Sequence, residues 1–283
     1  MGLGLGLPET LLGLLTALAA DAPEVSSAIA ALVRGKHDVG VGVVLGSNVF
    51  NIAAMIGLSA ILCGRIRIRR QALAIEGAVG IAVTLIAAAL ILKLLGAWVT
   101  IALLAVVIVP YLALLGRFGE RHRPDHALAH GERVLVPALM LVPALAIIVA
   151  GSAGMVDSAL RLASRWSVPD VIVGIIVLAI LTSLPNAFTA ARLAFQGRGS
   201  ALVSETLNSN SVNLVFGVAV PALFVTLSST SAITGFDLAW VLLMTVAALA
   251  LLAPRGGLGR SGGTAILLLY AVFVVVQIVS EYT

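Results

Sequence analysis

Charged residues are scarce in this chain of 283 residues, where they make up 11% of the sequence against 60% hydrophobic residues. A soluble domain of this size could not bury so much apolar surface, so the composition excludes that class. The single cysteine, Cys63, excludes an intramolecular disulfide, and we interpret it as a packing residue. A basic region that would open a cleaved signal peptide is lacking. A P-loop is lacking as well, which argues against an ATP-driven pump.

Long apolar runs are the feature that the chain does have. Runs of about 20 apolar residues fit membrane helices, because each helix satisfies its own backbone groups in lipid. We therefore predict an all-α polytopic membrane protein with about nine transmembrane helices, in contact with lipid and located in the plasma (inner) membrane. The runs lie approximately at residues 8–33, 38–63, 71–95, 97–116, 133–153, 168–196, 200–228, 234–253 and 264–281.

The longest polar interruption, residues 117–133, is charged and contains three histidines. No cysteine accompanies His122, His126 and His130, and a proline separates them, so a solvated linker is favoured over a metal site. The linker divides the chain into two halves. The predicted parts are a first membrane half at 1–116 with its repeat motif at 8–63, a cytoplasmic linker at 117–132, and a second half at 133–283 with its motif at 168–228.

Lysine and arginine are unevenly shared between the two sets of alternate loops. Of the 17 basic residues, 12 fall on the side that holds the linker and five on the other side. The positive-inside rule makes the first side cytoplasmic and places the C-terminus outside. Membrane topology thus explains the excess of basic over acidic residues, so no nucleic-acid partner is expected.

Two proline-centred stretches repeat at an offset of 162 residues. A-D-A-P-E (20–24) precedes G-S-N-V-F-N (46–51), and T-S-L-P-N (182–186) precedes N-S-N-S-V-N (208–213). Polar residues in membrane-length apolar runs are costly, so a repeated pair indicates a transport site. Five spans separate the starts of the two motif helices, so the copies enter the membrane from opposite sides. The sequence therefore predicts an inverted-topology repeat, the arrangement that builds alternating access in secondary transporters.

Pro23 and Pro185 fall near the middle of their apolar runs. A proline there removes one backbone hydrogen bond and bends the helix, which frees carbonyl groups to bind a cation. Asp21 and Glu24 are three residues apart on one helical face, where two carboxylates repel unless a cation or proton relieves them. Their hard oxygens suit Na⁺ or Ca²⁺. The alternative is a protonated acid with a structural role.

The remaining candidate ligands are uncharged apart from Glu205, which is four residues before Ser209 and eight before Asn213 on one stripe of a helix. Glu205 could line the access path or lie at the membrane interface. Glu76 also lies near the start of its span, without polar companions, and is predicted to be interfacial. The candidate cation ligands are Asp21, Glu24, Ser47, Asn51, Thr182, Ser183, Asn186, Glu205, Ser209 and Asn213.

At these residues the chain resembles the cation/calcium exchanger superfamily, the sodium/calcium exchanger-like membrane proteins. That family carries two repeats reading roughly G-T-S-x-P-E and G-N-x-x-G-S-N-x-F-N. A-A-D-A-P-E (19–24) and G-V-V-L-G-S-N-V-F-N (42–51) look like the first repeat, and I-L-T-S-L-P-N (180–186) with S-E-T-L-N-S-N-S-V-N (204–213) looks like a degraded second.

The resemblance implies a cation site where the four motif helices cross, with Glu24 as its principal carboxylate and no cofactor beyond the transported cation. Three positions depart from the family pattern. Asn186 replaces the second glutamate, Asp21 replaces the first serine, and Glu205 replaces the asparagine of the second G-N pair. Family members usually have ten helices, so a helix before the first motif is expected either to be lost or to lie upstream of Met1.

Three functions remain open from the sequence. The preferred one is a secondary-active antiporter that exchanges Ca²⁺ or Na⁺ for Na⁺ or H⁺ by alternating access. A sodium/proton exchanger competes with it, because Asn186 removes a charge that Ca²⁺ would favour. The third is a non-transporting membrane scaffold or binding protein. None of the three is an enzyme.

Overall fold

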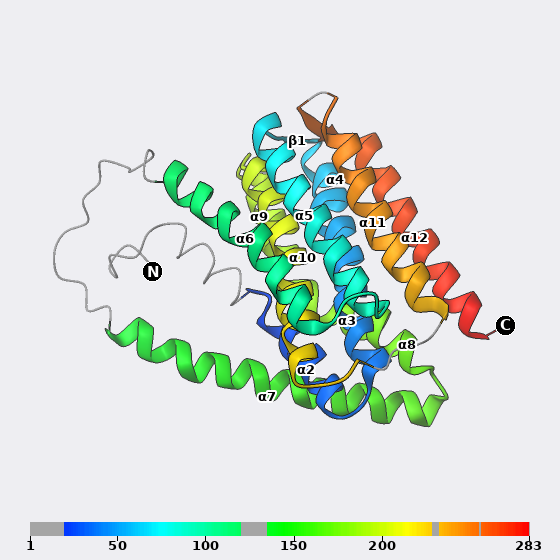
Figure 1. Cartoon of the computed structure of the whole chain (residues 1–283). Coiled ribbons are helices and arrows are strands. Elements are labelled where there is room, and N and C mark those ends of the chain that lie inside the picture. Colours follow the sequence, from blue (N-terminus) through cyan, green and yellow to red (C-terminus); the bar gives the residue numbers. More distant parts are fainter. Residues whose placement is uncertain (1–19, 120–134, 228–231, 255, 283) are drawn as a thin grey trace.

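The computed structural model describes residues 20–119, 135–227, 232–254 and 256–282, which form nine helical rods (Figure 1). The rods of the first part are α2 (Ala22–Val33); α3 (His37–Asn51) continued by the π-helix η2 (Ile52–Leu58) and α4 (Ser59–Cys63); α5 (Arg70–Ile91); and α6 (Ala97–Gly119). Next come α7 (Leu135–Trp166); α8 (Asp170–Ile172) continued by the π-helix η4 (Val173–Leu178) and α9 (Ala179–Phe195); and α10 (Gly199–Leu214) continued by the π-helix η5 (Val215–Ala219) and the short η6 (Pro221–Leu223). The last two are α11 (Ala232–Leu252) and α12 (Arg260–Tyr282).

Seven of these rods are long and apolar enough to cross a membrane. The other two are α2, of which the described part has 12 residues, and α10, which carries the polar second motif. The predicted all-α architecture with about nine helices is therefore confirmed. Most of the predicted linker, with its three histidines, lies outside the described residues.

One predicted boundary is wrong. The run predicted to end at about residue 153 continues as α7 to Trp166. There the helix continues through polar residues such as Arg161. The apolar pattern marks where lipid lies, whereas the helix ends where backbone hydrogen bonding ends.

The offset of 162 residues extends well beyond the two motifs. Moving α3 by 162 positions gives 199–213, within one residue of α10; moving α5 gives 232–253 and moving α6 gives 259–281, which match α11 and α12 equally well. The turns agree too, since Gly35 and Gly197 both have a positive φ, of 73° and 71°. A side chain is strained in that conformation, so both turns favour glycine. Among the helical rods, α7 falls outside this correspondence.

Two short strands establish that the repeats are inverted. The strand β1 (Arg65–Arg67) lies just before α5 and pairs antiparallel with β2 (Gly257–Gly259), which lies just after α11. The start of α5 and the end of its counterpart α11 therefore meet at the same end of the bundle, at the top of Figure 1. Equivalent helices run in opposite directions, as the odd number of intervening spans predicts.

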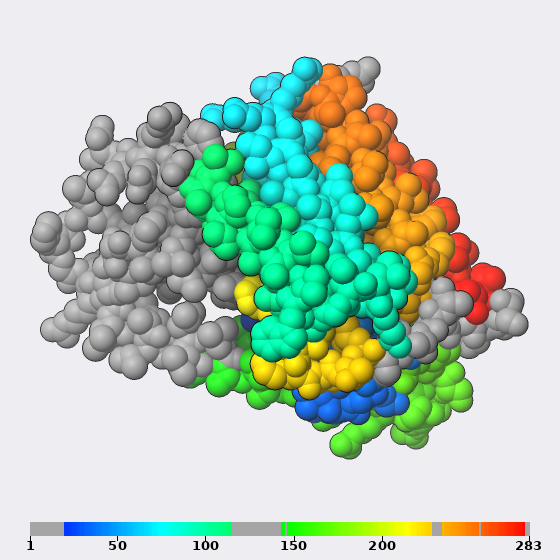
Figure 2. Space-filling model, in the orientation of Figure 1, coloured from blue at the N-terminus to red at the C-terminus, as the bar shows by residue number. Residues whose placement is uncertain are grey.

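The helix α3 forms the centre of the core, with every residue from Val39 to Val49 buried. Gly46 allows its close packing, since a Cβ atom there would lie 2.1 Å from the carbonyl oxygen of Ile175 in η4. On the face shown in Figure 2, α5, α6 and α11 form most of the described surface. The helix that carries Ser47 and Asn51 is thus fixed by its neighbours on several sides.

The helix α7 runs across the lower edge of the bundle in Figure 1, steeply inclined to the other rods. It packs on α2, and the Ser152 hydroxyl donates a hydrogen bond of 3.4 Å to the carbonyl oxygen of Pro23. An exposed ion pair of 3.0 Å joins Arg34 to Asp157 of α7. A second, of 2.8 Å, joins Lys36 to Asp170 of α8. These contacts tie the first motif helix to the start of the second half.

Candidate functional site

The two carboxylates of the first motif lie inside the protein. Asp21 is the N-cap residue of α2, which begins at the next residue and has Pro23 in its first turn. Pro23, which was predicted to lie near the middle of its apolar run, stands in the first turn of α2, where its missing N–H costs no hydrogen bond. Asp21 is 1% exposed and Glu24 is 0% exposed. Neither takes part in the two ion pairs of the described residues.

The carboxamide of Asn186 lies between these two acids. Its Nδ2 atom is 2.7 Å from Asp21 Oδ1, 2.9 Å from Glu24 Oε1 and 3.3 Å from Ser209 Oγ. Ser209 in turn donates to Asp21 Oδ1. Asn186 lies in α9 and Ser209 in α10, so both repeats contribute to the contact. The amide hydrogens face the same two carboxylates that a cation would contact.

The asparagines of the G-S-N and N-S-N stretches hold α3 and α10 together. Asn48 and Asn210 bond each other's backbone carbonyls, while Asn51 Nδ2 donates to Asn210 Oδ1 at 3.2 Å and Asn213 Nδ2 donates to Asn48 Oδ1 at 3.3 Å. These last two bonds are equivalent by the offset of 162. Asn48 and Asn210 were not among the predicted ligands. The repeated asparagines of the two motifs could have indicated that they join the two helices.

Buried oxygen atoms without a hydrogen-bond partner gather at this crossing. Such atoms are rare in folded proteins, because each costs the free energy of its lost hydration. Seven of them belong to predicted site residues: Asp21 Oδ2, Glu24 Oε2, Asn51 Oδ1, Ser183 Oγ, Asn186 Oδ1, Glu205 Oε2 and Asn213 Oδ1. Oxygen donors of this kind are the ligands that hard cations prefer. Ser27, buried in α2 with an unpartnered hydroxyl, was missed by the sequence analysis.

The other predicted residues occupy the edge of this group. The Thr182 hydroxyl donates to the Leu178 carbonyl of its own helix at 2.9 Å, and the Ser47 hydroxyl reaches Ala179 O at 3.5 Å. Both side chains are buried and leave lone pairs free. Glu205 is partly buried and interacts electrostatically with Asp21, without a hydrogen bond to it. No cluster of three His, Cys, Asp or Glu side chains occurs in the described ranges, so Ser and Asn oxygens make up most of the donor set.

Glu76 was predicted to lack polar companions, and this part of its prediction is wrong. Its side chain is 8% exposed, and the Ser204 hydroxyl of α10 donates to its Oε1 atom at 2.7 Å. Sequence spacing within α5 could not reveal a partner that comes from another helix 128 residues away.

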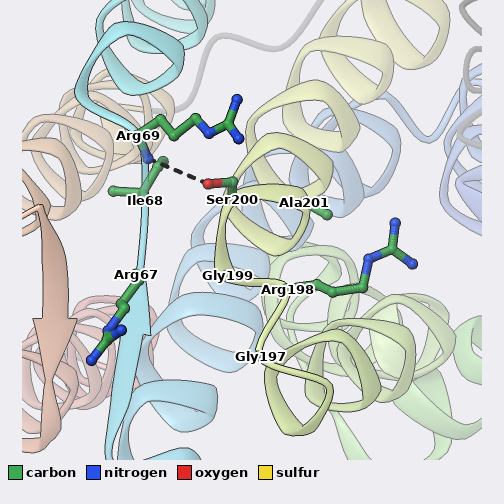
Figure 3. A pocket seen from close by; sticks show the side chains of 8 residues that line it. All are labelled: Arg67, Ile68, Arg69, Gly197, Arg198, Gly199, Ser200 and Ala201. Atoms are coloured by element: carbon green, nitrogen blue, oxygen red, sulfur yellow. Dashed lines mark hydrogen bonds between the residues drawn. The ribbon is translucent and has the colours of Figure 1, made fainter. Parts of the chain in front are cut away.

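An open pocket at the end of the bundle that carries β1 has the opposite electrostatic character. It is lined by residues 67–69 and 197–201, and its three arginines point in different directions (Figure 3). The Arg69 backbone N–H donates to Ser200 Oγ at 3.3 Å across it. Because the lining is basic, this pocket does not suit a cation, and the buried crossing remains the candidate site.

The chain is similar in sequence to several known membrane proteins. The Alkalimonas amylolytica protein CaxA, named as a candidate antiporter, is 27% identical over 262 residues, which is 89% of this chain and 82% of CaxA. The inner membrane protein YrbG of Escherichia coli is 28% identical over 229 residues, 77% of this chain and 70% of YrbG. The human sodium/potassium/calcium exchanger 4 is 36% identical over 124 residues, 41% of this chain and 20% of that protein.

The fold is similar to that of a solved structure, the sodium-calcium exchanger NCX_Mj. The TM-score is 0.69 at 22% identity, covering 92% of this chain and 84% of NCX_Mj. The sequence profile described as "Sodium/calcium exchanger protein" matches residues 2–117 and 136–279, which is most of the chain. The protein is thus a multi-pass integral membrane transporter rather than an enzyme, and it belongs to the sodium/calcium exchanger family.

Proposed function

We propose that this protein exchanges cations across the plasma membrane at the crossing of α2, α3, α9 and α10, with Na⁺ as one substrate and Ca²⁺ or H⁺ as the other. The observation that carries the proposal is the group of seven buried, unpartnered oxygens around Asp21 and Glu24. Two buried carboxylates without a basic partner need either a cation or protons to neutralise them. The E. coli relative, an inner membrane protein by name, supports the location.

Access to the site would alternate between the two sides. The site residues are almost completely buried, which corresponds to a closed state in which a cation would be sealed from water on both sides. The inverted repeats supply two equivalent packings, each opening toward one side of the membrane. The Asn186 amide, which now satisfies one oxygen of each acid, would have to turn for its free Oδ1 atom to become a ligand.

The charge count leaves Ca²⁺ and H⁺ as counter-substrates. Asp21 and Glu24 together neutralise one Ca²⁺ or two Na⁺, and partly buried Glu205 adds a carboxylate within electrostatic reach of Asp21. Asn186 instead favours the sodium/proton alternative, because α9 offers no carboxylate. Protons could then neutralise Asp21 and Glu24. The proposed ligands are the ten predicted residues, with Glu24 and Asp21 as the principal ones.

Flux into proteoliposomes tests the proposal. We expect ²²Na⁺ uptake driven by an opposing Ca²⁺ or H⁺ gradient, and near-complete loss of that uptake in Glu24→Gln. Asp157→Asn is the matched control, since it removes an exposed carboxylate outside the site. Uptake driven by pH but unaffected by Ca²⁺ would select the sodium/proton exchanger. Wild-type protein without any counterflow would overturn transport in favour of a scaffold, and full activity in Glu24→Gln would remove the assigned site.

A further inference from the structure

A second polar group lies between α5, α6 and α10, outside the crossing of the motif helices. The Tyr111 hydroxyl donates to Asn208 Oδ1 at 2.9 Å, and Asn208 Nδ2 donates to Ser204 Oγ at 3.4 Å. Ser204 then donates to Glu76 Oε1 at 2.7 Å. Ser204 and Asn208 are one turn apart on α10, on a stripe next to that of Glu205 and Ser209. Four side chains from three helices are thus joined in one chain.

All three hydrogen bonds point toward the Glu76 carboxylate. A chain of donors ending at an acid stabilises its negative charge and offsets part of the cost of burying it. Glu76 is 8% exposed, and its other oxygen, Oε2, is buried without a partner. Neither ion pair of the described residues includes Glu76. A buried carboxylate with one unsatisfied oxygen and no basic partner is neutralised either by a proton or by a bound cation, and its free oxygen is available as a ligand.

The fold itself does not require polarity at these positions. By the offset of 162, Ser204 and Asn208 correspond to Gly42 and Gly46, Glu76 corresponds to Leu238, and Tyr111 corresponds to Phe273. Leu238 and Phe273 are buried apolar residues in the other repeat. At the four equivalent positions the other repeat is thus apolar, although Asp237, next to Leu238, is buried and accepts a hydrogen bond from Gln277 of α12. The difference between the repeats shows that these particular polar side chains are not needed for the helices to pack.

We propose that Glu76 and Ser204, positioned by Asn208 and Tyr111, form a second cation site for Na⁺. One carboxylate carries one negative charge, so a monovalent cation neutralises it, whereas Ca²⁺ would leave a buried positive charge. Carboxylate and hydroxyl oxygens suit this small hard cation. Glu76 is six residues from the start of α5, about 9 Å along its axis, so the site is nearer the end that carries β1 than the central crossing is. Its assignment does not rest on the central crossing being a transport site.

Equilibrium ²²Na⁺ binding to the purified full chain in nanodiscs, at fixed pH, tests this site. Glu76→Gln is expected to bind one Na⁺ fewer per chain while keeping the Na⁺ that Glu24→Gln removes. Tyr111→Phe is expected to lower the affinity for that one Na⁺ by about three- to tenfold, since the hydrogen bond from Tyr111 to Asn208 is lost. Phe273 at the equivalent position shows that the architecture accepts phenylalanine there. Thr84→Ala, which removes a buried hydroxyl of α5 outside the group, is the control.

The proposal is overturned if Glu76→Gln binds the same number of Na⁺ with the same affinity, as it would if Glu76 were protonated and only structural. Should Glu76→Gln fail to fold by size-exclusion chromatography, Ser204→Ala takes its place in the same measurement, and unchanged binding in that variant overturns the proposal equally. Loss of Na⁺ binding in Glu24→Gln alone would support the central site and count against this one.

Discussion

Asn48 and Asn210, which are equivalent by the offset of 162, bind each other reciprocally. Asn48 Nδ2 donates to the Asn210 carbonyl at 3.1 Å, and Asn210 Nδ2 donates to the Asn48 carbonyl at 3.0 Å. Each carboxamide thus reaches the backbone of the opposite repeat. The pair lies on the pseudo-two-fold axis between the repeats and fixes the distance between α3 and α10.

We expect that replacing either asparagine by alanine destabilises the protein by about 1–3 kcal/mol, because a buried partner group is left unsatisfied. The double variant should cost clearly less than the sum of the two, since the first substitution already breaks the pair. Denaturation of the four proteins of this cycle measures the coupling. Strict additivity would mean that the two amides act independently.

The close contact at Gly46 gives a second prediction. Gly46→Ala places a methyl group against the Ile175 carbonyl, so α3 and η4 must separate, and we expect a loss of about 3 kcal/mol or more, or failure to fold. Gly151→Ala in α7 is the control, because its added Cβ atom meets nothing within 4 Å. That control should be neutral or slightly stabilising. Equal thermal stability of the two variants would contradict the packing argument.

A third prediction concerns the ion preference set by Asn186. Asn186→Glu adds a carboxylate beside Asp21 and Glu24 and should shift competition toward Ca²⁺ over Na⁺ by about tenfold or more, because ligand charge tunes Ca²⁺ affinity. Asn186→Gln keeps the amide and should not shift it in that direction. Inhibition of ²²Na⁺ uptake by Ca²⁺ measures the preference in each variant. Equal inhibition by Ca²⁺ in Asn186→Glu and Asn186→Gln would show that charge at this position does not decide selectivity.

Substrate binding should also stabilise the fold. A cation that binds only the folded protein at 100 times its Kd adds about 2.7 kcal/mol, so the melting temperature should rise with Na⁺ or Ca²⁺ and fall when they are replaced by a large organic cation. Glu24→Gln should lose most of that rise, whereas Asp157→Asn should keep it. A rise that survives in Glu24→Gln would place the stabilising ion elsewhere.

Much of this protein could be predicted from residue patterns. The apolar runs predicted the helical rods, and the odd number of spans between the motifs predicted their opposite directions. The burial of Asp21, Glu24 and Asn186 could be predicted because these polar residues lie within membrane-length apolar runs. The length of α7 did not follow, because a helix continues through polar residues once its hydrogen bonds are formed.

The sequence by itself determined the membrane class, the inverted repeats and the set of oxygen-bearing residues, because hydrophobicity and spacing are local properties of the chain. Only the tertiary structure decided which of those oxygens meet. It placed the Asn186 amide between two acids of the opposite repeat, reciprocally paired Asn48 with Asn210, and gave Glu76 a partner from α10. Such contacts join residues more than 100 positions apart, and their geometry depends on how whole helices pack.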